Sequence, residues 1–175
     1  MHVFLQGPRG IGKSTVIQAA LELLAQSHTI LLGGFFTWNG GADDPNIYIR
    51  PAEPGAVGER YRIASYGGPS LGMVCDSQIF DTVGARILRE SAQGETADLI
   101  VMDELGYLES DAEAFKRAVF ETLSGDTPVL GVLRSGDVPW HEPIKRDPRV
   151  MIYNVNEENR GDLPREVIRM LDKKA

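Results

Sequence analysis

The segment Gly7–Ser14 has the residue types and the spacing to bind phosphate. It reads GPRGIGKS and satisfies the pattern G-x-x-x-x-G-K-[ST]. Gly7 and Gly12 allow backbone angles that turn successive N–H groups toward an anion, and a helix beginning near Lys13 adds the positive end of its dipole. We expect Lys13 to reach the β- and γ-phosphates of a nucleoside triphosphate and the Ser14 hydroxyl to bind Mg²⁺.

The context of this loop also fits a phosphate site, because an apolar strand precedes it and an amphipathic helix follows it. Pro8 and Arg9 occupy variable positions of the pattern, and we expect Arg9 to face solvent rather than to act in catalysis. The predicted nucleotide-binding residues of the loop are Gly7, Pro8, Arg9, Gly10, Ile11, Gly12, Lys13, Ser14 and Thr15.

Two acidic residues, Asp103 and Glu104, follow the continuous apolar run Leu99–Met102. Such a run predicts a strand covered on both faces, and ligands of open parallel sheets lie beyond the carboxyl ends of the strands. If this strand lies near the phosphate loop, Asp103 holds the magnesium ion through a water molecule. Glu104 then positions or deprotonates the water that attacks the γ-phosphate. The predicted catalytic residues are Lys13, Asp103 and Glu104, and the predicted metal ligands are Ser14 and Asp103.

Other residues are candidates with two interpretations each. Arg134 follows the apolar run 129–133, so it could neutralise charge on the transferring phosphoryl group or form a surface ion pair. Glu109 is either a second carboxylate behind the site or the first polar residue after a loop. Four aromatic residues could stack on a nucleobase or anchor the core and its loops; these are Phe35, Phe36, Trp38 and Trp140.

The segments that must position these residues alternate between strand and helix patterns. We expect strands at 3–5, at 29–32 closed by Gly33 and Gly34, and at 99–102, 129–133 and 150–155. We expect helices at 14–24, 79–92 and 113–123, and one that starts near Pro164. A hairpin of 48–50 with 61–64 and a capping box at 110–113 are further expectations. This alternation predicts the α/β class, with a mostly parallel sheet flanked by helices on both faces.

Composition narrows the class of protein further. Lys and Arg total 18 against 25 Asp and Glu, so the net charge of −7 argues against broad nucleic-acid binding. Cys75 is the only cysteine, which suits a reducing compartment, and no apolar run is long enough to span a membrane. We expect one domain over residues 1–175 and a cytoplasmic location.

Several blocks of the chain resemble the THEP1-type nucleoside-triphosphatases, also called cancer-related nucleoside-triphosphatases in animals. The similar blocks are the N-terminal HVFLQGPRGIGKST, GFFT at 34–37, the stretch 74–89, MDELGYLE at 102–109 and YNV with ENR at 153–160. The resemblance implies a RecA-like P-loop fold and slow, Mg²⁺-dependent hydrolysis of ATP, GTP and other nucleoside triphosphates. It also implies that Asn159 and Arg160 approach the base or sugar, although capping of the last helix explains them equally well.

The chain departs from that family pattern in two places. Tyr107 stands where the family usually has a lysine, and Leu108 replaces the usual methionine; residues 39–59 match poorly. Two alternatives to hydrolysis stay open. One is a kinase that passes the γ-phosphate to a small molecule, a nucleoside or a nucleotide, with Arg134, Arg146 and Arg149 in a lid, and the other is a nucleotide-controlled protein-binding module.

Overall fold

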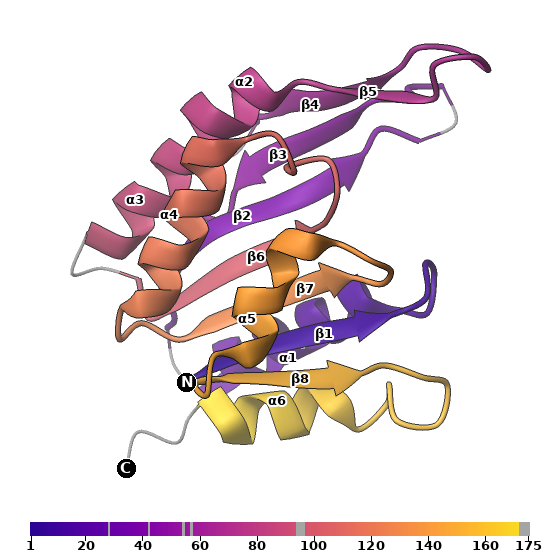
Figure 1. Ribbon diagram of the computed structural model, residues 1–175. Helices are drawn as coiled ribbons and strands as arrows, with labels where there is room; N and C mark the ends of the chain where they lie inside the picture. Colours follow the sequence, from indigo (N-terminus) through magenta and orange to yellow (C-terminus); the bar gives the residue numbers. More distant parts are fainter. Residues whose placement is uncertain (28, 42, 54, 57, 94–96, 172–175) are drawn as a thin grey trace.

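The computed structural model describes residues 1–27, 29–41, 43–53, 55–56, 58–93 and 97–171. Within these residues, eight strands form one sheet in the order β5-β4-β3-β2-β6-β7-β1-β8 (Figure 1). Their bounds are β1 (His2–Gly7), β2 (Leu32–Asn39), β3 (Ile47–Pro51), β4 (Tyr61–Tyr66), β5 (Met73–Cys75), β6 (Leu99–Leu105), β7 (Val129–Arg134) and β8 (Val150–Asn154).

The sheet consists of a parallel part and an antiparallel extension. Strands β2, β6, β7, β1 and β8 run parallel to one another, whereas β3, β4 and β5 continue the sheet beyond β2 as an antiparallel meander. The hairpin expected in the middle of the chain is therefore confirmed as β3 and β4. Strand β7 lies between β1 and β6, so the strand before the phosphate loop and the strand before the acidic pair are not direct neighbours.

Helices cover both faces of the sheet, which confirms the predicted three-layer α/β/α architecture (Figure 1). One face packs against α1 (Lys13–Ser27) and α6 (Leu163–Leu171). The other face packs against α3 (Ala85–Gln93), α4 (Glu113–Ser124) and α5 (Glu142–Arg146). A short helix α2 (Ser77–Ile79) and a π-helical turn (Phe80–Gly84) lead into α3, and a 3₁₀ turn (Pro139–His141) leads into α5.

The apolar runs of the central strands supply both cores because successive side chains of a strand point to opposite faces. In β1, Val3 and Leu5 belong to the core under α1 and α6, whereas Phe4 belongs to the core under α3 and α4. Strand β6 divides in the same way, with Val101 on the first side and Met102 on the second. Burial on both faces explains why these strands lack a polar alternation.

The expectation that Gly33 and Gly34 close a strand is wrong. Strand β2 begins at Leu32, passes through both glycines and continues to Asn39. A Cβ atom on Gly34 would overlap the carbonyl oxygen of Val101 in β6, and Gly34 has a φ of 83°, a left-handed conformation that favours glycine. The glycines therefore allow close approach inside the sheet, and the strand carries its later residues to the carboxyl edge of the sheet.

The predicted capping box before α4 is also wrong. The helix begins at Glu113 with Ala112 as its N-cap, and no side chain of this segment caps it. Instead, the carboxylate of Asp81, in the π-helical turn, accepts a hydrogen bond from the backbone N–H of Phe115 at 3.0 Å. A carboxylate at a helix N-terminus satisfies a free N–H group and interacts favourably with the helix dipole. Asp81, distant in the sequence, therefore caps α4 in place of a local side chain.

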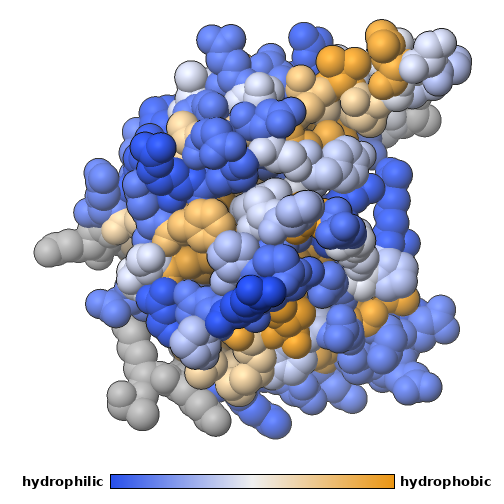
Figure 2. Space-filling model, in the orientation of Figure 1, coloured by the Kyte–Doolittle hydropathy of each residue, from blue (hydrophilic) through white to orange (hydrophobic). Residues whose placement is uncertain are grey.

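The surface seen in Figure 2 is largely hydrophilic over the helices, and apolar side chains gather at the tip of the β4–β5 hairpin. Leu71 at that tip is 71% exposed and Val74 in β5 is 46% exposed. Among the described residues, no helix combines the length and the apolar composition needed to cross a membrane.

Two histidines, His2 and His141, are fully buried, and their ring nitrogens have no hydrogen-bond partner among the described residues. Burial lowers the pKa of each histidine from 6.5 to about 4. Below pH 6.5 the unfolded chain therefore binds protons that the folded chain does not. We expect the histidine contribution to stability to be complete above pH 6.5 and to be lost progressively as the pH falls toward 4.

Urea unfolding of the wild type and of His141→Phe at several pH values between 7 and 4 measures this effect. The free energy of unfolding should fall more steeply with acidification in the wild type, by on the order of 1–3 kcal/mol over this range. Burial raises the pKa of Asp103 to about 6 and of Glu109 to about 7. These two carboxyl groups therefore make the folded protein more stable as the pH falls, opposite to the histidines, but they do so equally in both proteins. Parallel pH profiles would contradict the prediction.

Candidate active site

The phosphate loop connects the carboxyl end of β1 to the first turn of α1 and closes around the lysine side chain. The Lys13 Nζ donates hydrogen bonds to the carbonyl oxygens of Gly7 at 2.8 Å and Pro8 at 2.9 Å. Gly10 and Gly12 have φ angles of 80° and 106°, which a side chain would oppose. The loop thus holds a buried cation at the amino end of a helix, an arrangement that attracts an anion.

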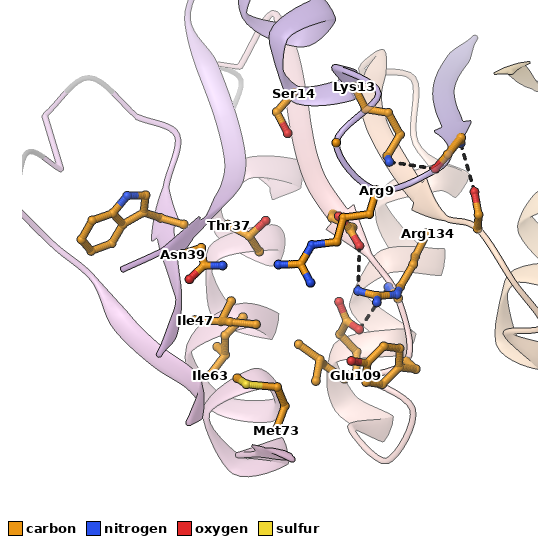
Figure 3. Close-up of a pocket in the computed structure, with 18 of the residues that line it drawn as sticks. Arg9, Lys13, Ser14, Thr37, Asn39, Ile47, Ile63, Met73, Glu109 and Arg134 are labelled. Atoms are coloured by element: carbon orange, nitrogen blue, oxygen red, sulfur yellow. Dashed lines mark hydrogen bonds and ion pairs between the residues drawn. The ribbon is translucent and has the colours of Figure 1, made fainter. Parts of the chain in front are cut away.

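The acidic strand end reaches this loop even though β7 lies between them. The Ser14 hydroxyl, at the amino end of α1, donates to Asp103 Oδ1 at 3.4 Å. Thr37, near the end of β2, donates from Oγ1 to the backbone carbonyl oxygen of Asp103. Figure 3 shows Lys13, Ser14 and Thr37 around one cavity. The structure therefore brings together the two segments whose convergence the sequence left conditional.

Asp103 is 5% exposed and lies beside a second carboxylate. Its pKa is raised to about 6 by burial and by the charge of Glu104, while the Ser14 hydrogen bond and the Lys13 ammonium act in the opposite direction. A cation between Ser14 and Asp103 would offset this cost. The two oxygen donors suit Mg²⁺, which binds hydroxyl and carboxylate oxygens and shares its remaining positions with water and phosphate.

Glu104 lies next to Arg134 at the ends of the neighbouring strands β6 and β7. Arg134 Nη1 is 3.4 Å from Glu104 Oε1, and its guanidinium lies 4.5 Å from the ring centroid of Tyr107. Arg134 is therefore brought into the site, where it can interact with a transferring phosphoryl group. Tyr107 supports this arginine through its aromatic ring.

The loop after Glu104 is fixed by two side chains that the sequence left ambiguous. Glu109 is 3% exposed and accepts a hydrogen bond from the Gly106 N–H at 3.1 Å. Trp140 donates from Nε1 to the Gly106 carbonyl oxygen at 2.8 Å. Glu109 is thus a buried carboxylate in the wall of the cavity that holds the loop after Glu104, and Trp140 is a loop anchor rather than a base-stacking residue.

The other three aromatic candidates for base stacking are Phe35, Phe36 and Trp38. Phe35 is fully buried in the core, and Phe36 is partly buried with Arg50 over its ring at 4.8 Å. Trp38 lines the cavity but packs against Tyr48 at 5.4 Å between ring centroids. The rings of Phe35 and Phe36 are therefore committed to internal packing.

The cavity has a volume of about 910 Å³ and runs from the phosphate loop to the antiparallel strands. Arg9 is exposed, as predicted, but its side chain extends into the cavity toward Thr37 and Asn39 (Figure 3). Thr37 and Ser135 were missed as individual site residues. Ser135 Oγ accepts a hydrogen bond from the Gly7 N–H at 3.1 Å. In the sequence, the feature that indicated a site residue here was the position of Ser135 directly after Arg134, at a strand end.

Asn159 and Arg160 differ in their position. Asn159 accepts from the Asn156 N–H and donates to the Asn154 carbonyl oxygen, so it stabilises the turn that leads to α6. Arg160 Nη1 donates to the Ile11 carbonyl oxygen at 3.4 Å, which places this arginine beside the phosphate loop. Neither residue lines the cavity, because both follow β8 on the other side of β1.

The proposed lid of Arg146 and Arg149 is wrong. Arg149 pairs with Asp147 at 2.8 Å, and its carbonyl oxygen accepts from the N–H of His2 at the amino end of β1. Arg146 ends α5, just before this point, and pairs with Glu142 at 3.6 Å. Both arginines therefore lie at the amino ends of the parallel strands, whereas the phosphate loop lies at their carboxyl ends.

The parallel sheet, the glycine-rich loop before α1 and the acidic end of β6 define a P-loop protein that binds nucleoside triphosphates. The sequence profile of a family described as NTPase matches residues 2–168. The chain belongs to this family, the THEP1-type nucleoside-triphosphatases.

Individual relatives agree with this assignment. Nucleoside-triphosphatase THEP1 of Methanosarcina barkeri is 33% identical over 171 residues, with 95% of each chain covered. The cancer-related nucleoside-triphosphatase homolog of Mus musculus is 31% identical, with 95% of this chain and 94% of the relative covered. The solution structure of a human cancer-related nucleoside triphosphatase superposes with a TM-score of 0.78 at 27% identity, covering 99% of this chain and 98% of that one. The crystal structure of THEP1 from Aquifex aeolicus shares the fold, with a TM-score of 0.75, 20% identity, and 99% and 100% covered.

Proposed function

We propose that this chain hydrolyses nucleoside 5′-triphosphates, ATP and GTP among them, to the diphosphate and phosphate in a Mg²⁺-dependent reaction. The observation that carries the proposal is the 3.4 Å contact of Ser14 with Asp103, because it joins the phosphate loop to the acidic strand end. Glu104, the next residue, lies at the same edge of the sheet and lines the cavity.

The residues have separable roles in this reaction. Lys13 and the loop N–H groups bind the phosphates, and Ser14 and Asp103 would hold Mg²⁺, which supplies charge stabilisation for the transferring phosphoryl group. Glu104 accepts a hydrogen bond from the attacking water and takes its proton. Arg134 lies 3.4 Å from Glu104, the residue that holds the attacking water in this proposal. The arginine is therefore near the γ-phosphate and can compensate its negative charge. Phosphoryl transfer depends mainly on such positioning and charge compensation rather than on covalent catalysis.

Acceptance of several bases is part of the proposal. The relatives are named nucleoside-triphosphatases without a specified base, which supports broad rather than selective recognition. Approach of Arg160 to the sugar or base is consistent with its place beside Ile11. A single domain and a cytoplasmic location stay predictions from the sequence, and a nucleotide-controlled protein-binding module stays an alternative.

A phosphate-release assay with ATP, GTP, CTP, UTP and dTTP tests the proposed function. Each reaction is run with Mg²⁺ and with excess EDTA, and no acceptor other than water is added. We expect phosphate release from more than one triphosphate with Mg²⁺ and none above background with EDTA. Equal release in both conditions would contradict the metal dependence, and no release from any triphosphate would contradict the hydrolase assignment.

A further inference from the structure

The cavity has two chemically different halves. The P-loop half is polar and charged, with Lys13, Ser14, Glu104 and Arg134. The distal half is mainly apolar and is formed by the antiparallel extension of the sheet; its lining side chains are Asn39, Ile47, Ile63, Tyr66 and Met73. Figure 3 shows Ile47, Ile63 and Met73 on the side of the cavity opposite Lys13 and Ser14, with Arg9 extending between the two groups.

The strand order fixes the direction in which these halves follow one another. Along the carboxyl edge of the sheet, Arg160 follows β8, the phosphate loop follows β1, and Glu104 lies in the last two residues of β6. The distal half belongs to β2–β5, which lie beyond β6. Glu104 thus separates the phosphate loop from the distal half.

The geometry of phosphoryl transfer then assigns a side to each group of the substrate. The attacking and leaving oxygens lie roughly in line with the γ-phosphorus. Because Glu104 marks the attacking side, the β-phosphate and the nucleoside lie on the opposite side, toward Arg160 and the first turn of α1. The distal half therefore opens on the attacking side of the γ-phosphorus. A nucleoside triphosphate bound in this orientation leaves the distal half unfilled.

The volume and the lining chemistry indicate what fits there. Ligand cavities span about 300–1,000 Å³, and this cavity of about 910 Å³ exceeds what the phosphate groups alone require. Ile47, Ile63 and Met73 provide apolar walls for a flat ring. The Asn39 amide, which makes no hydrogen bond within the described part of the chain, can pair with the edge of a base. The guanidinium of Arg9 extends into the space between this region and the phosphate loop, where it suits an anion.

We propose that the distal half binds a nucleoside monophosphate as a phosphoryl acceptor, so that the chain also transfers the γ-phosphate from a nucleoside triphosphate to a nucleoside monophosphate. This proposal rests on the proposed function, because it uses the same triphosphate site. It assigns a second substrate to residues of β2–β5 that hydrolysis does not use.

The transfer step is balanced without a further reactant. A phosphate oxygen of the monophosphate attacks the γ-phosphorus and forms a P–O–P bond. The bond from the γ-phosphorus to the bridging oxygen of the β-phosphate breaks, and its electron pair leaves with the first nucleoside diphosphate. The products are two nucleoside diphosphates. A phosphate monoester loses its second proton with a pKa of about 6, so the attacking group needs no general base at neutral pH.

The wild-type protein is tested with [γ-³²P]ATP, Mg²⁺ and one of GMP, CMP, UMP or dTMP. Labelled GDP, CDP, UDP or dTDP is separated from labelled phosphate by chromatography. We expect a labelled diphosphate with at least one acceptor. Labelled phosphate without any labelled diphosphate would overturn the acceptor proposal and leave hydrolysis intact. The absence of both labelled products would contradict the proposed hydrolase function and, with it, the acceptor proposal.

Two matched tryptophan variants locate the acceptor. Met73→Trp fills the distal half, whereas Val74→Trp places the same ring on the opposite, exposed face of β5. Met73→Trp should lower kcat/KM for the monophosphate roughly 10–100-fold and leave acceptor-free hydrolysis within about two-fold. Val74→Trp should change neither. If Met73→Trp instead raises the KM for ATP in hydrolysis, the distal half holds the base of the triphosphate and the proposal is wrong.

Glu104→Gln separates the two reactions chemically. Hydrolysis needs the carboxylate as a base for water, but transfer to a dianionic phosphate does not. The ratio of labelled diphosphate to labelled phosphate should therefore rise in this variant. An unchanged ratio would overturn the assignment of the acceptor to the attacking side.

Discussion

Lys13→Ala is expected to reduce turnover to less than about 1% of the wild-type rate, mainly by weakening triphosphate binding. The Lys13 ammonium is buried and lies 2.8 and 2.9 Å from the carbonyl oxygens of Gly7 and Pro8, so the loop already holds it where phosphate binds. A hydrogen bond to a charged group contributes about 1.5–3 kcal/mol. Loss of one such contact corresponds to a roughly 10–100-fold weaker affinity, and loss of charge compensation in the transition state adds to the loss of turnover.

Calorimetric titration with a non-hydrolysable triphosphate and phosphate release together measure this effect. Lys145→Ala is a suitable control, because Lys145 forms an exposed pair with Glu142 at 3.2 Å on α5, away from the phosphate loop. Its turnover should match the wild type. Thermal unfolding of both variants separates a binding defect from a folding defect. Wild-type affinity and turnover in a folded Lys13→Ala protein would remove this lysine from the site.

Glu104→Gln should bind the triphosphate with near wild-type affinity but hydrolyse it about 10²–10⁴-fold more slowly, the range for loss of a general base. The amide keeps the size of the side chain and can still accept a hydrogen bond, but it cannot take a proton from water. Because the Glu104 side chain is 35% exposed, loss of its pair with Arg134 should cost little stability.

Single-turnover phosphate release measures the chemical step for this variant. Glu121→Gln is the matched control, since Glu121 pairs with Arg89 at 3.4 Å, the same distance as in the Glu104–Arg134 pair, on exposed helical surface. The control should hydrolyse at the wild-type rate. A Glu104→Gln protein with normal turnover would exclude Glu104 as the base and would favour a water positioned by other groups.

The parts of the site that are continuous in the chain were predictable. The phosphate loop depends on local backbone geometry and on the helix that follows it, and both are encoded within Gly7–Thr15. Strands β1, β6 and β7 were predictable because burial on both faces requires apolar runs. The placement of Asp103 and Glu104 at a strand end followed from the same argument.

The contacts between distant segments were not predictable in this way. The order of strands depends on how whole elements pack, so no residue of β1 or β6 indicates that β7 lies between them. Gly33 and Gly34 looked like a strand end, because the close approach of Gly33 to Ser91 in α3 and of Gly34 to Val101 in β6 is invisible without these partners. Arg149 was a different kind of error, because its position directly before the expected strand 150–155 already placed it at the amino edge of a parallel sheet, away from the phosphate loop.

The sequence by itself therefore determined the phosphate loop, the acidic pair and the α/β class, since each depends on interactions within a few residues or on a regular period. Only the tertiary structure decided that Ser14 meets Asp103, that Arg134 meets Glu104, and that Asn39 and Met73 extend the cavity past the γ-phosphate side. In the two hydrogen-bonded pairs, Ser14 with Asp103 and Arg134 with Glu104, the partners lie 30 or more positions apart in the chain. Their formation depends on the packing of strands and helices around two cores, a long-range property that local patterns do not contain.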